Sequence, residues 1–133
     1  MTFSRSVCIA AIGAALVANL SAGQYSSFAT AKRAAEQAKN TSAGYNYMVK
    51  FCDAMDIAVG QAMRSCMPNS PGRKTDIRYD VIFVVGADGR VQQVFTSPGS
   101  KVGACFTQTL KAPRVPRPPR DGWPVIASLV HGP

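Results

Sequence analysis

Residues 76–130 constrain the fold most, because their pattern predicts strand, tight turn, strand, helix, Pro-rich connection and strand in that order. Residues 77–86 (IRYDVIFVVG) are the most apolar run after the first 23 residues. Asp88-Gly89 between two β-prone runs is a strong hairpin signal, and we expect the return strand over residues 90–96. Residues 101–111 have helical spacing, and residues 123–130 are apolar and β-prone.

The faces of the two hairpin strands predict the order of the sheet. Alternation places one apolar set on one face of the first strand: Ile77, Tyr79, Val81, Phe83 and Val85. Ile82 and Val84 make its other face apolar too, so this strand belongs in the middle of a sheet. The second strand is predicted to place Val91, Gln93 and Phe95 on one side and to be half exposed. We therefore expect the order second, first, third.

A long helix is predicted over residues 45–67, after a break at residues 42–44. One apolar stripe recurs along it at steps of three or four: Met48, Cys52, Met55, Val59, Met63 and Cys66. A Met-rich stripe fills a core more often than it forms an adaptable binding surface. With helices 45–67 and 101–111 on one face of the sheet, the fold class is α+β. It is a two-layer sandwich with a three-stranded antiparallel-type sheet (a ββαβ core) and a long preceding helix packed on one face.

The first 23 residues have the layout of a secretory signal peptide. A short segment containing Arg5 precedes an apolar run at residues 7–20, and small residues follow at Ala22 and Gly23. The run is shorter than the roughly 20 residues that span a bilayer, so we expect cleavage rather than a retained anchor. The mature chain then has no transmembrane segment and is periplasmic or secreted, where disulfides form. Residues 24–41 are predicted to form an N-terminal helical arm, with a helix at 27–39 that is either loose or docked.

Three cysteines remain after the predicted cleavage: Cys52, Cys66 and Cys105. In one straight helix Cys52 and Cys66 would lie roughly 21 Å apart, whereas a disulfide needs Cα atoms within about 7 Å. We therefore predict a Cys66–Cys105 disulfide and a buried free thiol at Cys52. With His131 as the single histidine and no close Cys-x-x-Cys pair, no metal site, cofactor or catalytic set is predicted.

The chain is basic, with 15 Lys and Arg against 7 Asp and Glu. This excess suits anionic partners, although it also serves solubility. Lys111, Arg114, Arg117 and Arg120 recur every third residue among prolines. In a polyproline II helix these cations would line one edge at spacings of roughly 9 Å. The segment is either a binding edge for phosphates or acidic groups, or a rigid connection with solvated charges. Nucleic acid is not an expected partner, because no aromatic residues are interleaved with these charges.

Four features in one order carry a family resemblance. They are the DGRV turn at residues 88–91, the V-x-x-S-x-G segment at 94–99, a helix containing the ACF run, and the P-x-PP connection at 116–119. With them, about the last 55 of 133 residues resemble the TonB C-terminal domain, in its small periplasmic, cysteine-containing version. The resemblance implies an αββαβ-like domain, here residues 42–133, that acts through protein contacts and not catalysis. Energy transducers of that family carry a Pro-rich spacer ahead of the domain, whereas no Pro precedes Pro68 here.

These features together predict an exported, non-enzymatic interaction module that binds another envelope protein. The second and third strands would be sheet edges, so addition of a partner strand is a natural mode of binding. The alternative is a basic binding protein for an anionic envelope component, or an immunity-type inhibitor, acting through residues 111–120.

Overall fold

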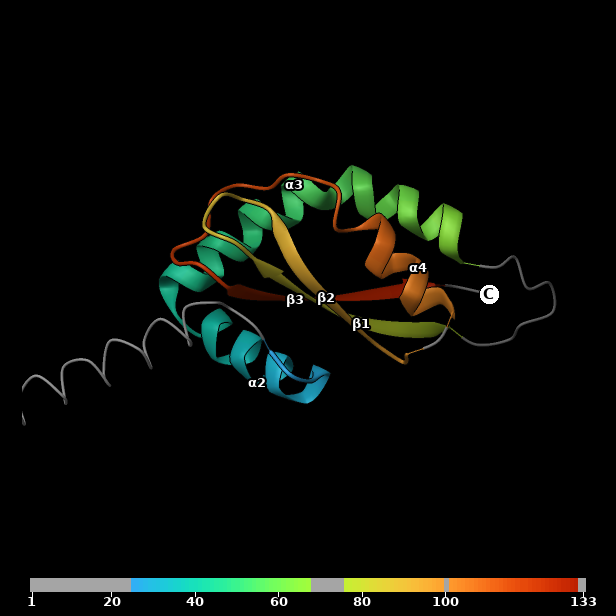
Figure 1. Ribbon diagram of the computed structural model, residues 1–133, viewed down its shortest axis with the longest axis horizontal. Coiled ribbons are helices and arrows are strands. Elements are labelled where there is room, and N and C mark those ends of the chain that lie inside the picture. The colour runs from blue at the N-terminus through green and yellow to red at the C-terminus, as the bar shows by residue number, and fades with distance from the viewer. Residues whose placement is uncertain (1–24, 68–75, 100, 132–133) are drawn as a thin grey trace, which may run out of the picture.

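The computed structural model describes residues 25–67, 76–99 and 101–131, and its elements follow the predicted order (Figure 1). They are α2 (Phe28–Lys39), α3 (Ser42–Cys66), β1 (Ile77–Val85), β2 (Val91–Ser97), α4 (Lys101–Thr109) and β3 (Trp123–His131). The predicted signal peptide at residues 1–23 lies outside the described residues. Of the helices in the described ranges, none combines the length and the apolar character that a membrane crossing requires.

The sheet has the predicted order β2-β1-β3, with β1 in the centre. Both strand pairs are antiparallel, and Val81 of β1 lies opposite Thr96 of β2 and Ala127 of β3. The turn between β1 and β2 requires glycine at position 89, which has a φ of 81°. A Cβ atom at Gly89 would also overlap the carbonyl oxygen of Val115. The hairpin turn is therefore in close contact with the Pro-rich connection.

α3 and α4 pack on one face of the sheet, as predicted (Figure 1). Aromatic side chains join the layers: the ring centroids of Phe51 and Phe83 are 5.0 Å apart. Tyr79 meets Phe106 of α4 edge to face at 5.8 Å. Such aromatic pairs contribute about 0.5–1.5 kcal/mol beyond their buried area. This layer and the sheet form the predicted α+β sandwich.

α2 covers the opposite face of the sheet, so the predicted N-terminal arm is docked and not loose (Figure 1). The Ser27 side chain caps the helix by accepting a hydrogen bond from the Thr30 amide. Ala31 and Ala35 are buried against Ile82 of β1. Because alanine is small, α2 lies close to the strand, and the second apolar face of β1 is buried.

The predicted break at residues 42–44 was wrong, because these residues form the first turn of α3. Thr41 caps α3 by accepting a 3.0 Å hydrogen bond from the Gly44 amide. Gly44 is buried, and a Cβ atom there would overlap the backbone of Ala38 in α2. Glycine at position 44 therefore permits a tight approach of two helices and does not end one.

The predicted face of Val91 in β2 was also wrong, because a β-bulge shifts the register of this strand. Val94 pairs with Phe83, but Val91 pairs with Val85, so one extra residue stands between them. Val91 and Val94 consequently both enter the core beneath α3 and α4. Gln93 turns instead toward the α2 side, where it accepts a 3.0 Å hydrogen bond from the Tyr25 amide.

The predicted Cys66–Cys105 disulfide is present. The two Cα atoms are 5.6 Å apart, within the usual range for a disulfide. The bond joins the last residue of α3 to α4 and fixes the two helices of this layer to each other.

Candidate functional site

The basic Pro-rich segment, residues 111–120, is held along the outside of the β1–β2 turn. The Val115 amide donates a 3.0 Å hydrogen bond to the Gly89 carbonyl, and Arg114 forms an isolated β-bridge with Arg90. The Tyr47 hydroxyl donates to the Pro116 carbonyl at 2.8 Å. These contacts make the segment a fixed connection between α4 and β3.

The four cations predicted to bind, Lys111, Arg114, Arg117 and Arg120, are all exposed. The Arg120 guanidinium lies 5.1 Å from the centroid of the Trp123 ring, and its Nη1 donates to the Asp121 carbonyl at 3.4 Å. Arg120 therefore has a local structural role. The other three form no ion pair with any carboxylate in the part of the chain that the structure describes.

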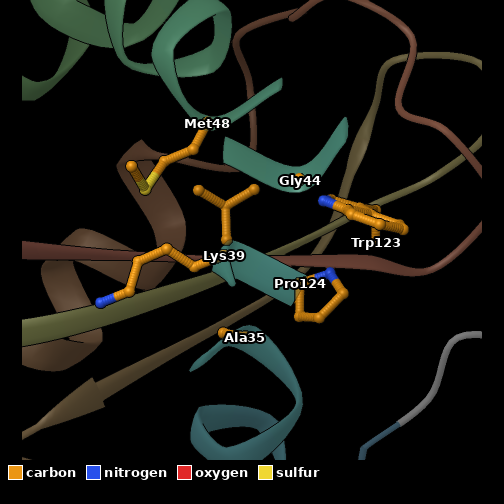
Figure 2. Close-up of a pocket in the computed structure, with 7 residues that line it drawn as sticks. Ala35, Lys39, Gly44, Met48, Trp123 and Pro124 are labelled. Atoms are coloured by element: carbon orange, nitrogen blue, oxygen red, sulfur yellow. The ribbon is translucent and has the colours of Figure 1, made fainter. Parts of the chain in front are cut away.

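β3 is an edge strand whose beginning is covered and whose later part is open. Its first residues, Trp123, Pro124 and Val125, are buried. Figure 2 shows the α2–α3 junction at Gly44 beside Trp123 and Pro124. The cavity there has a volume of about 10 Å³, which is too small for a ligand. Ser128 and Val130 are exposed. Among the described residues, no backbone hydrogen bond joins residues 126–131 to any segment but β1.

A groove lies between α3 and the open part of β3, and we call it the apolar groove. Its volume is about 210 Å³. Its lining comprises Phe51, Met55 and Val59 of α3 with Phe83, Ala127 and Leu129 of the sheet, together with Cys52, Asp56 and Ser128. Ala127 has the smallest side chain of the sheet residues that line this groove.

A second groove lies on the α2 side of the same edge, and we call it the polar groove. Its volume is about 540 Å³. Its lining comprises Lys32, Glu36 and Lys39 of α2, Arg78 and Asp80 of β1, and Met48, Ile126 and Ser128. Figure 2 shows Lys39 and Met48 extending in the same direction, away from Trp123.

Asp80 forms more ion pairs and hydrogen bonds than the other charged residues that line the polar groove. Lys32 Nζ lies 3.8 Å from one of its carboxylate oxygens. Arg78 Nε lies 4.0 Å from the other, which also accepts a 2.8 Å hydrogen bond from the Ser128 hydroxyl. This network neutralises the Asp80 carboxylate, and neither Lys39 nor Glu36 forms an ion pair with another described residue.

Cys52 was predicted to be a buried thiol, and that prediction was wrong: the residue is exposed. The aromatic side chains Tyr47 and Phe51 occupy the core instead, which rotates the buried face of α3 away from Cys52. The thiol borders the apolar groove. Partial burial there, and then the Asp53 carboxylate, raise the pKa of the Cys52 thiol, which disfavours the thiolate.

Sequence reasoning missed both grooves, although one signal was present. Ala127 stands between Val125 and Leu129 on the face of β3 that the long helix covers. A small residue between larger ones on such a face leaves a hollow when the helix does not follow the strand. In the described ranges, no group of three His, Cys, Asp or Glu residues is placed to hold a metal ion.

No protein-family model, no curated protein and no solved structure matches this chain. Its function is therefore inferred from the surfaces described above.

Proposed function

We propose that the protein is an exported, non-enzymatic interaction module that binds an extended segment of another envelope protein as an added strand. Its domain would be of the TonB C-terminal-like type that the sequence resembles. The observation that carries the proposal is the open edge of β3 at residues 126–131. An edge strand presents a row of unpaired N–H and C=O groups, which is a template for another extended chain.

The composition of this edge supports the proposal. Natural proteins usually protect exposed edges with charged residues, prolines or bulges. Residues 126–130 (IASLV) contain no charge and no proline, and Pro124 lies in the buried beginning of the strand. Val130 is 52% exposed. An uncharged, β-prone edge left open in this way is suited to pairing.

β2 is the less suitable edge. Its beginning is occupied by the Arg90–Arg114 bridge to the Pro-rich segment. Its bulge also disrupts the regular spacing of backbone groups that an added strand would need. β3, by contrast, pairs with β1 in one unbroken register along its whole length.

The disulfide supports the exported location. Disulfides persist in the periplasm and outside the cell and are rare in the cytosol. The Cys66–Cys105 bond therefore agrees with the signal-peptide layout of residues 1–23. A periplasmic or secreted module would meet its partner in the cell envelope.

The test uses dodecapeptides selected from a random display library on the purified protein. Each binder is resynthesised with single N-methyl groups at successive backbone nitrogens, and binding is measured by fluorescence anisotropy. Strand addition predicts that N-methylation at every second position weakens binding about tenfold, while the positions between have little effect. Insensitivity to all N-methyl groups would contradict the proposal.

A second candidate function is binding of an anionic envelope component or an acidic protein surface through residues 111–120. The side chains of Lys111, Arg114 and Arg117 favour it, because they are exposed and form no ion pair with another described residue. The net charge of +8 favours it as well. Such binding would fall steeply with salt, because the screening length drops from about 10 Å at 0.1 M to about 3 Å at 1 M. It would also be lost in an Arg114→Ser, Arg117→Ser variant, whereas strand addition at β3 would persist.

A further inference from the structure

The open edge of β3 lies between two grooves of different chemistry. Ala127 and Leu129 face the apolar groove under α3, and Ile126 faces the polar groove on the α2 side. Ser128 borders both. A strand added at this edge would project successive side chains alternately into the two grooves, because side chains in a strand alternate between faces.

The side chains that enter the α3 side would meet apolar surface. Met55 and Val59 of α3 and Leu129 of β3 line a space of about 210 Å³ there. Burying an aliphatic side chain in it removes apolar surface from water on both partners. A carboxylate in the same position would lose hydration and would be repelled by the exposed Asp56 carboxylate. This side therefore selects apolar residues at every second position.

The side chains that enter the α2 side would meet an excess of positive charge. The polar groove has three cations, Lys32, Lys39 and Arg78, against the carboxylates Glu36 and Asp80. Asp80 already contacts Lys32 and Arg78. Neither Lys39 nor Glu36 has an ion-pair partner in the described ranges. The groove therefore keeps one excess cation, and an incoming carboxylate would complete the charge balance.

We infer that the partner segment alternates apolar with acidic side chains, so that apolar residues fill the apolar groove and carboxylates contact Lys39 and its neighbours in the polar groove. This inference rests on the proposed strand addition and names the class of partner that the edge would take. A second copy of β3 fits less well. Its residues 126–130 contain no carboxylate and would leave Lys39 uncompensated.

The experiment uses three end-capped dodecapeptides in which valine alternates with glutamate, with serine or with lysine. Dissociation constants for the purified protein are measured by fluorescence anisotropy at neutral pH and moderate salt. We expect the glutamate peptide to bind about tenfold more tightly than the serine peptide, and the lysine peptide to bind most weakly. Alternate N-methylation should weaken the glutamate and serine peptides equally.

Four variants distinguish the contributions of the two grooves to peptide binding. Lys39→Gln should bring the glutamate and serine peptides to nearly equal affinity, and Lys39→Glu should reverse the preference toward the lysine peptide. Arg33→Gln is the matched control, because Arg33 is an exposed cation of the same helix that does not line the groove. Val59→Ser should weaken the binding of all three peptides by a similar factor and leave the order of their affinities unchanged.

The outcomes distinguish this inference from the function on which it rests. The glutamate and serine peptides could bind equally well, with binding still weakened by N-methyl groups at every second position. That result would overturn the acidic preference and leave strand addition standing. A glutamate preference that survives Lys39→Gln but vanishes in the double variant Arg114→Ser, Arg117→Ser would also overturn this inference. It would show that the carboxylates bind the basic Pro-rich segment and not the polar groove. Absence of binding by all three peptides, or binding blocked by self-association of the protein, would overturn both.

Discussion

The Tyr47 hydroxyl donates a 2.8 Å hydrogen bond to the carbonyl oxygen of Pro116, and this contact links α3 to the Pro-rich segment. Tyr47 is only 5% exposed. Burial raises the pKa of Tyr47 to about 12. The phenol is therefore held neutral in the folded protein over a range of pH in which it ionises in the unfolded chain.

Tyr47 should make stability depend on alkaline pH. Because its folded pKa lies above the unfolded value of about 10, its contribution is complete below pH 10 and is lost as the pH rises toward 12. Urea unfolding between pH 9 and pH 12 should show a decline of roughly 2–3 kcal/mol from this group. Tyr47→Phe should remove that component of the decline and cost about 0.5–1.5 kcal/mol at pH 7.

The matched control for this prediction is Tyr45→Phe. Tyr45 belongs to the same helix but is 55% exposed. The Tyr45→Phe variant should leave both the stability at pH 7 and the alkaline decline in stability unchanged. An equal alkaline decline in wild type and Tyr47→Phe would show that another group is responsible.

The two glycines of α3 should respond oppositely to alanine. A Cβ atom at Gly44 would overlap the backbone of Ala38. Outside the nearby helix backbone, the described atom nearest to a Cβ at Gly60 is Arg64 Nη1, at 3.6 Å. Gly44→Ala must therefore move α2 away from α3 and should cost at least 2 kcal/mol, about the size expected of core overpacking. Gly60→Ala should stabilise by up to about 1 kcal/mol through helix propensity. Thermal unfolding of both variants checks the prediction, and a stable Gly44→Ala protein would contradict the tight junction.

The order and type of the elements could be predicted because local patterns are strong there. The apolar side chains of β1 and the Asp88-Gly89 turn specify a hairpin through local sequence alone. The errors arose where tertiary contacts override the local pattern. Gly44 serves a helix–helix contact, and the bulge in β2 adds one residue that alternation cannot reveal. The grooves depend on how α3 and α2 lie relative to β3, and such an arrangement between elements has no periodic signal.

The Cys66–Cys105 disulfide should be a major source of stability. It closes a loop with a sequence separation of 39, for which loop entropy gives roughly 3–4 kcal/mol. Replacing both cysteines with serine should lower the free energy of unfolding in urea by about that amount. Cys52→Ser is the control, since Cys52 is free and exposed. Dithiothreitol should destabilise wild type and Cys52→Ser equally, and a double-serine variant as stable as wild type would refute the prediction.

The rate at which the Cys52 thiol is alkylated should report the effect of its surroundings on its pKa. Partial burial of its side chain beside the apolar groove, and then the Asp53 carboxylate, raise the pKa of the Cys52 thiol, so the thiolate fraction at pH 8 is lower than that of an ordinary cysteine. Alkylation by iodoacetamide, followed by mass spectrometry across pH 7–10, should reach half of its maximal rate above the usual cysteine pKa. Asp53→Asn should shift this midpoint downward and speed the reaction at pH 8, whereas Glu36→Gln on α2 should not. A midpoint at or below the usual value, or one that Asp53→Asn leaves unmoved, would contradict this account of the thiol.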